Sequence, residues 1–418
     1  SHASPAALAF ANCDLDRALE LAQAEGNTGI AIRCAAEIRT REAAELASGL
    51  FDRSRPDERS RILESHIYSR AWDFLQPLIQ DADPLPANWL QWLDRVKDGN
   101  WSEAESVVSE WAGCWDPAEF GAVSSNIDDL VKALQATYVG SAEETLNTCL
   151  PDLAAFCLKL EDHRRLADLC EALVVQFSLS DRPSRGTLDM VGELIRRAVQ
   201  SGCSSQLYAQ MVEALIDYVW PAVRSPHAFV PALDVMDALI DINACDPGAR
   251  LRFFQLLMNE AKRPAIRATA DALSLLRTYS QELEVALDPA LIERQAQSRE
   301  LLKDDPVAQF LSGKSIGIYS LQVSVRMRLP RLLRDIAEDI GPMTVDDATV
   351  ATSSLKKAAR AVDFFIIDTA HATHEATSCI DSNRPSALET CRVHRRGVPS
   401  MMASIRERVP QFCCRRAA

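Results

Sequence analysis

Glycine is scarce in this chain of 418 residues, with 15 occurrences, and proline is not enriched, with 20. Collagen-like and low-complexity sequences contain far more of both, so neither class fits. Long apolar runs are missing too, because no stretch approaches the roughly eighteen residues that a membrane-spanning helix needs. The chain starts at Ser1 without methionine and without a basic segment followed by an apolar one. We therefore expect no signal peptide, a cytoplasmic location and no membrane partner.

Three common sequence motifs for catalysis and cofactor binding are also missing. The chain contains no glycine-rich Walker loop, no His-Glu-x-x-His pair and no Gly-x-Gly-x-x-Gly fingerprint. None of the 12 cysteines forms a Cys-x-x-Cys pair, and the seven histidines do not supply the other ligands of a zinc site. We expect no metal, no cofactor and no catalytic residues, and an enzyme is the less favoured class.

Acidic and basic residues are unevenly distributed along the chain, whose formal charge is −14. Residues 311–418 hold 16 basic and 11 acidic side chains, a net charge of +5, so residues 1–310 hold 29 basic and 48 acidic ones, a net charge of −19. An acidic surface repels phosphate backbones, so any nucleic acid is expected to bind the C-terminal part. The alternative is that the acidic residues only keep a large helical protein soluble.

Residues 6–303 have the apolar spacing of helices almost throughout. Apolar residues recur at steps of three and four, and the alternation that is typical of strands is missing. This pattern predicts helical hairpins stacked into an irregular solenoid, which we place at residues 1–303 as an interaction scaffold. The chain resembles tetratricopeptide-like solenoids in architecture alone, because it has no fixed period of roughly 34 residues.

After residue 306 the pattern changes to short β-rich runs that alternate with helices. The expected strands are residues 316–319, 343–345, 364–367 and 387–393. The expected helices are residues 331–338, residues 353–361, one beyond residue 370 and one from about residue 399. This alternation predicts a parallel sheet with crossover helices and a ligand crevice at the carboxyl ends of the strands.

The predicted fold class is therefore mostly α. An irregular helical-hairpin solenoid is followed by a small C-terminal α/β Rossmann-like domain at residues 314–408 with a parallel sheet. Residues 409–418 are expected to be a frayed tail.

Two short segments of this C-terminal part carry a family resemblance. Residues 368–374 read Asp-Thr-Ala-His-Ala-Thr-His, and residues 395–400 read Arg-Arg-Gly-Val-Pro-Ser. They resemble the bacterial family called domain of unknown function 2325, which favours Thr-x-x-x-Ser-His and Gly-x-x-Ser at these places. The resemblance covers roughly residues 314–405. It implies a Rossmann-like module that is an accessory part of a bacterial multi-protein system, such as anti-phage defence.

The chain departs from that family at two places. Ser320 and Leu321 stand where the family tends to have Gly-Gly, a turn that lets backbone amides approach a ligand. In the helix after His374, Asp381 stands where the family often has a lysine. Both changes weaken the case for a phosphate ligand or a catalytic centre. They favour a degenerate module that is kept for binding or assembly.

The candidate ligand-binding residues lie at the ends of the last two expected strands or follow them, and they are Thr369, Thr373, His374, Arg392, Arg395, Gly397 and Ser400. A helix N-terminus favours anions, and a neutral imidazole there donates to a phosphate or accepts a proton. In the alternative interpretation, Thr369 only caps the helix while His374 binds a neighbouring loop, and His371 is exposed.

An acidic metal site at the strand ends is disfavoured. Asp346 and Asp347 follow the second strand and Asp368 ends the third, as in a receiver domain. However, the first strand ends without an acidic pair, so no magnesium site assembles from this pattern.

The leading hypothesis is a non-enzymatic scaffold or accessory subunit of a bacterial multi-protein system, with anti-phage defence as the expected context. Its partners are then other protein subunits, which bind the solenoid or the C-terminal module. The alternative is an enzyme or sensor that acts on a nucleotide or nucleic acid through the C-terminal crevice. A third hypothesis, DNA binding by the basic module without sequence preference, predicts an affinity that falls steeply with salt.

Overall fold

The structure is a computed structural model, and it describes residues 4–79, 85–97, 99, 101–161, 163–180, 184–301, 305–337, 339–394 and 397–417. The chain folds into two compact units, residues 1–91 and residues 92–418. The helical region that we expected at residues 1–303 therefore spans two units.

The first unit is a helical bundle with its own core. Its helices are α1 (Pro5–Ala11), α2 (Leu15–Glu25), α3 (Thr28–Ile38), α4 (Arg41–Arg53), α5 (Pro56–Glu64) and α6 (His66–Ile79). Capping side chains set two of the starts, because Asn27 accepts a hydrogen bond from Ile30 N and Thr40 accepts one from Ala43 N. Alanines pack the helices closely, and Phe51 stacks on Trp72 with ring centroids 4.1 Å apart.

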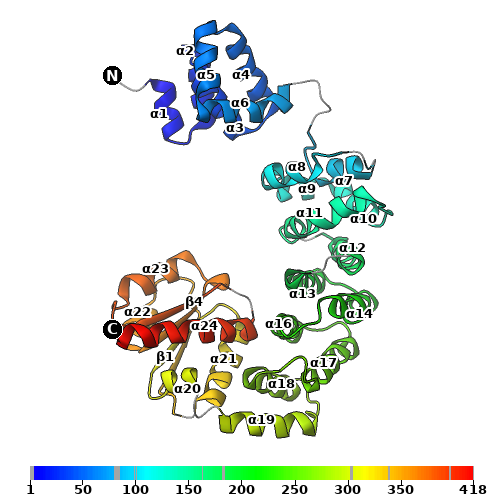
Figure 1. Ribbon diagram of the computed structural model, residues 1–418, viewed down its shortest axis with the longest axis vertical. Coiled ribbons are helices and arrows are strands. Elements are labelled where there is room, and N and C mark those ends of the chain that lie inside the picture. Colours follow the sequence, from blue (N-terminus) through cyan, green and yellow to red (C-terminus); the bar gives the residue numbers. More distant parts are fainter. Residues whose placement is uncertain are drawn as a thin grey trace. The chain divides into compact units, whose positions relative to one another are not determined.

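The second unit begins with an array of helices. They are α7 (Trp89–Lys97), α8 (Ala104–Trp111), α9 (Pro117–Ala122), α10 (Ser124–Leu134), α11 (Ser141–Cys157), α12 (Leu166–Leu179), α13 (Arg185–Gln200), α14 (Ser205–Ala214), α15 (Trp220–Val223), α16 (Phe229–Asp241), α17 (Pro247–Lys262), α18 (Ala270–Glu282), α19 (Pro289–Leu301) and α20 (Pro306–Leu311). Figure 1 shows that α11, α13, α16 and α18 form one layer, and that α10, α12, α14 and α17 form another.

In the described residues, four strands form one parallel sheet that follows this array. They are β1 (Ile316–Tyr319), β2 (Met343–Asp346), β3 (Phe364–Asp368) and β4 (Glu389–Val393), in the spatial order β2-β1-β3-β4. The two central strands are buried on both faces, as expected for a parallel sheet covered by helices. The chain crosses β1 on its way from β2 to β3. The switch point of the topology, where such sheets hold ligands, therefore lies between β1 and β3.

Helices cover the sheet on both faces and fasten it to the array. α21 (Val323–Ile336) and α24 (Val398–Ala417) lie on one face and pack against α18 and α16 of the array. α22 (Ser353–Ala361) and α23 (His374–Asn383) pack together on the other face. The array and the α/β module thus belong to one compact unit. The predicted fold class, mostly α with a small C-terminal α/β domain, is confirmed.

Two predicted elements differ from the structure. The helix expected at residues 331–338 instead spans Val323–Ile336, with Pro330 inside it. Residues 409–417, expected to be a tail, continue α24, where Val409 is fully buried. Val409 and Phe412, whose ring lies against Phe310 and Phe364, pack this part of the helix against the rest of the fold.

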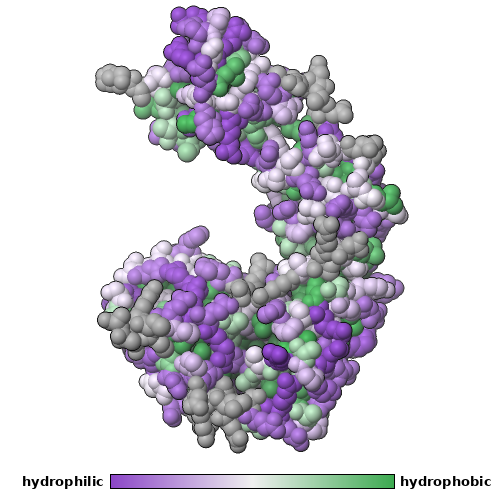
Figure 2. Space-filling view, viewed as in Figure 1, coloured by the Kyte–Doolittle hydropathy of each residue, from purple (hydrophilic) through white to green (hydrophobic). Residues whose placement is uncertain are grey.

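The surface is mainly polar on the face that Figure 2 shows, where hydrophobic residues form small, scattered patches. Among the described helices, none combines the length and the apolar character that crossing a bilayer requires.

Candidate functional site

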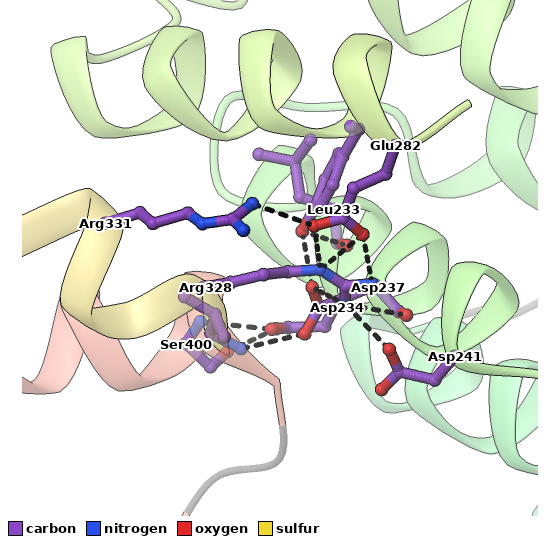
Figure 3. Close-up of polar contacts among 10 residues, drawn as sticks. Leu233, Asp234, Asp237, Asp241, Glu282, Arg328, Arg331 and Ser400 are labelled. Carbon is purple, nitrogen blue, oxygen red and sulfur yellow. Dashed lines mark hydrogen bonds and ion pairs between the residues drawn. The ribbon is translucent and has the colours of Figure 1, made fainter. Parts of the chain in front are cut away.

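The first turn of α24 binds two aspartates of helix α16. Val398 N donates to Asp237 Oδ2 at 3.1 Å, and Ser400 N donates to Asp234 Oδ1 at 3.0 Å. The Ser400 hydroxyl also bonds to Asp234 Oδ2 (Figure 3). The first N–H groups of a helix have no acceptor within the helix, so they attract anions and other acceptors. Here carboxyl groups of the same chain occupy the position that we expected for a ligand.

Gly397, which precedes this turn, allows the close approach. Its φ of +86° is in the left-handed region, which side chains rarely adopt. A Cβ at residue 397 would lie 2.9 Å from Asp234 Cγ, closer than van der Waals contact allows. The glycine therefore serves the contact between α16 and α24.

Arg328 of α21 lies at the centre of the same interface. Its Nη1 is 2.7 Å from Asp237 Oδ1 and 2.8 Å from Asp241 Oδ1, and its Nη2 is 2.7 Å from Glu282 Oε2. Tyr279 donates to Asp237 Oδ1 at 3.0 Å. The Arg328 side chain is only 5% exposed, so its charge depends on these carboxylates (Figure 3). The guanidinium therefore joins α16, α18 and α21 in one polar network.

The pKa values in this network follow from burial and charge. Burial raises the pKa of Asp234 well above its ordinary value of 3.8, although hydrogen bonds from Ser400 lower it in part. Burial also raises the pKa of Asp237, and the positive charge of Arg328 opposes that shift. Burial acts to lower the pKa of Arg328, but Asp237 and Glu282 raise it above its ordinary value. Asp234 therefore holds its proton more firmly than an exposed aspartate, while Arg328 stays charged.

A second cluster occupies the switch point between β1 and β3. Asp368 Oδ2 accepts a hydrogen bond from Ser320 Oγ at 2.7 Å and lies 3.2 Å from His371 Nδ1. Gln322 N donates to Ser320 Oγ at 3.0 Å, and the Gln322 side-chain amide lies 2.9 Å from His371 Nε2. His371, expected to be exposed, is thus held between an aspartate and a glutamine because the loops after both strands meet here.

This cluster differs from a nucleophilic triad in its order. In a triad the histidine lies between the nucleophile and the acid, so that it takes the proton from the hydroxyl. Here the carboxylate lies in the middle and binds the hydroxyl directly, and Ser320 is fully buried. The cluster orients His371 and ties the two strand ends together, but it does not activate Ser320.

The two threonines of the predicted site bind different parts of the chain. Thr369 donates to Val393 O at 2.7 Å and contacts His394 Nδ1 at 2.6 Å, which links β3 to β4. Thr373 donates to Thr349 O at 2.7 Å and accepts a hydrogen bond at the start of α23. Thr373 therefore caps α23. The alternative interpretation of the sequence had assigned this cap to Thr369.

The other predicted residues are also distributed over separate contacts. His374 is exposed in the first turn of α23. Arg392 forms an ion pair with Asp381, the residue that stands in place of the lysine of the resembled family. Arg395 lies outside the described residues. The structure brings Gly397 and Ser400 together at the array, away from these contacts.

A groove lies where α21 leaves the sheet and meets α16 and α18. It has a volume of about 560 Å³. Val323 and Met327, one turn apart on α21, are 64% and 53% exposed and line it. Asp241, Glu282 and Arg331 also line the groove. Exposed apolar residues next to charged ones are found at many binding surfaces.

A family model described as DpdD-like matches residues 1–404. The chain belongs to the DpdD-like family. This family is part of a DNA-modification system, the Dpd system, that is associated with phage defence. The match covers the first unit and the second unit as far as the start of α24. The family model therefore includes the array together with the α/β module. No curated protein and no solved structure matches the chain. The resemblance to domain of unknown function 2325 stays a prediction.

Two other sequence patterns in this DpdD-like chain, a Gly-x-Ser-x-Gly segment and the aspartates at the end of β2, are held by contacts within the fold. Gly313-Lys314-Ser315-Ile316-Gly317 has the residue pattern of a nucleophile elbow, but it leads into β1 instead of following a strand, and Ser315 Oγ donates to Asp363 at 2.6 Å. Asp346 accepts a hydrogen bond from Ala348 N, and Asp347 pairs with Arg326. Within the described ranges, no three metal-binding side chains are grouped.

The network around Arg328 is the feature that our sequence analysis missed. Asp234, Asp237 and Asp241 recur at steps of three and four in α16, which is otherwise apolar. Carboxylates on the face of a buried helix need partners, so this spacing could have indicated an interface. It could not have named Arg328, which lies 91 residues from Asp237.

Proposed function

We propose that this chain is a non-enzymatic assembly subunit of the DNA-modification system to which its family belongs. In this proposal, the helical array and the α/β module act as one scaffold for other protein subunits. One observation carries the proposal: Asp234 and Asp237 of the array occupy the N-terminus of α24, where our sequence analysis placed the ligand-binding residues Gly397 and Ser400. A module whose ligand position is filled by its own chain is suited to assembly rather than to turnover.

The groove beside α21 is the surface that we propose for a protein partner. Val323 and Met327 supply exposed apolar area, and the charged side chains around them supply directional contacts. Exposed apolar side chains next to each other cost solubility, so their presence in a groove favours a partner that covers them.

Co-expression with each protein encoded beside this chain tests the proposal. We expect at least one of them to co-purify and to give a complex of defined mass by light scattering. The double variant Val323→Asp/Met327→Asp should lower the affinity at least tenfold. Val350→Asp is the matched control, because Val350 is 49% exposed but does not line the groove. A chain that stays uncomplexed with every co-expressed protein would contradict the proposal.

The second candidate function is action on a nucleotide or nucleic acid at the switch point. The observation that favours it is the oriented His371, which lies beside Asp368 and Gln322 at the strand ends. Thermal unfolding with a panel of nucleotides distinguishes the two candidates. A nucleotide-specific rise of the midpoint that is lost in His371→Ala or His374→Ala would favour this candidate, whereas the scaffold proposal predicts no rise.

A further inference from the structure

Two cysteines from neighbouring helix pairs lie against each other in the array. Cys203 Sγ is 3.5 Å from Cys245 Sγ, and both are free thiols. Cys203 lies in the loop between α13 and α14, and Cys245 lies in the loop between α16 and α17. We propose that these two residues form a redox-active dithiol, which a hydroperoxide oxidises to a disulfide.

The positions of the two sulfurs permit the bond. A disulfide has an S–S distance of about 2.0 Å, so the sulfurs need to approach by about 1.5 Å. Neither cysteine is part of a helix, so the movement breaks no regular helical hydrogen bonds. Gly202, with a φ of +81°, precedes Cys203 in the turn that ends α13, where Cys203 N donates to Ala198 O at 3.1 Å, so the sulfurs approach by side-chain rotation. By contrast, the buried Cys149, Cys157 and Cys170 are held within helices.

The difference in exposure indicates which of the two thiols reacts first with the peroxide. Cys203 is only 8% exposed, whereas Cys245 is half-buried and is the sulfur that solvent reaches more easily. Burial raises the pKa of Cys203 to about 12, so this thiol keeps its proton at neutral pH. Cys245 is therefore the sulfur that reacts with the peroxide, and Cys203 is the one that closes the disulfide.

The chemistry balances with hydrogen peroxide as the oxidant. The Cys245 sulfur attacks one peroxide oxygen, the O–O bond breaks, and a sulfenic acid and one water form. The Cys203 sulfur then attacks the Cys245 sulfur, the S–O bond breaks, and the hydroxyl leaves as a second water with the thiol proton. In total, two thiols lose two electrons and two protons, and one peroxide becomes two waters.

The bond would join two loops next to the interface that holds the α/β module. The loop with Cys245 directly follows α16, the helix that carries Asp234 and Asp237. A cross-link between residues 203 and 245 restricts the unfolded chain and the end of α16. We therefore expect the oxidised protein to unfold at a higher temperature than the reduced one.

The experiment uses the full chain, treated with hydrogen peroxide, blocked with N-ethylmaleimide and digested without reductant. We expect a cross-linked peptide pair that contains Cys203 and Cys245, the joint loss of these two thiols whatever happens at Cys13, and full reversal by dithiothreitol. Cys245→Ser should abolish the cross-link, whereas Cys13→Ser, at an exposed thiol in the first unit, should leave it unchanged. The proposal is overturned if both thiols stay reduced at peroxide concentrations that oxidise Cys13, or if Cys245 stops at the sulfinic acid. Peptide mapping of the unmutated chain shows whether the Cys203–Cys245 cross-link forms, even if a variant does not fold.

Discussion

Gly397 approaches Asp234 so closely that a side chain at residue 397 would overlap the aspartate carboxyl group. The two residues are 163 positions apart in the chain, and their contact joins the helical array to the α/β module. Because Asp234 also binds both polar groups of Ser400, this contact holds the start of α24 against α16. The same interface carries three of the following predictions.

Gly397→Ala should lower the free energy of unfolding by about 2–3 kcal/mol, because the new Cβ combines a strained positive φ with the overlap. Gly313→Ala is the matched control: its φ is +69° and nothing lies within 4 Å of an added Cβ, so about 1 kcal/mol is expected there. Urea unfolding measures both. In an Asp234→Ala background the cost of Gly397→Ala should fall toward that of the control, and additive costs would contradict the overlap.

Arg328→Met should destabilise the chain by about 3–5 kcal/mol, because it leaves Asp237, Asp241 and Glu282 near one another without their cation. Lower pH should restore part of this stability as the carboxylates take up protons. Arg334→Met on the same helix is exposed and should change stability by less than about 0.5 kcal/mol. Equal midpoints for the two variants in chemical denaturation would show that the network contributes little.

Asp234→Asn should change the dependence of stability on pH. Since the pKa of Asp234 is raised on folding, its contribution is complete below about pH 4 and is lost as pH rises toward the folded pKa. An asparagine keeps the shape and does not titrate. The variant should therefore gain stability relative to the unmutated chain as pH rises from 4 to 8 in denaturant titrations. A gap between the two proteins that stays constant over this range would refute the raised pKa.

Ser320→Ala should lower the free energy of unfolding by about 1–3 kcal/mol. It removes the hydroxyl that donates to the buried Asp368 and accepts a hydrogen bond from Gln322 N. The exposed Ser382 of α23 supplies the control variant, Ser382→Ala, which should be neutral. Heat-induced unfolding followed by circular dichroism compares the two. No loss in Ser320→Ala would mean that Asp368 is satisfied by His371 alone.

Local sequence pattern was sufficient for most elements of the C-terminal module. The strand at 316–319 and the helix at 353–361 have the predicted bounds, because a short apolar run and a capped amphipathic stretch are each local signals. The predicted start of α21 at residue 331 was wrong, because Val325 and Leu329 are already buried on this helix and tertiary packing holds Pro330 inside it.

For the candidate site, by contrast, local sequence pattern did not show which groups the chosen residues bind. Thr369, Thr373 and Ser400 were chosen because they follow strands or begin helices, and the structure gives each of them a different partner. Those partners lie 24 to 166 residues away, and no local pattern identifies them.

By itself, the amino-acid sequence determined a mostly helical chain with a small parallel α/β module, since periodicity and crossover rules act over tens of residues. Tertiary structure alone decided what occupies the N-terminus of α24 and where the charge of Arg328 is neutralised. The physical reason is that a buried polar group must be satisfied by whatever group folding brings next to it, and that group lies far away in the chain.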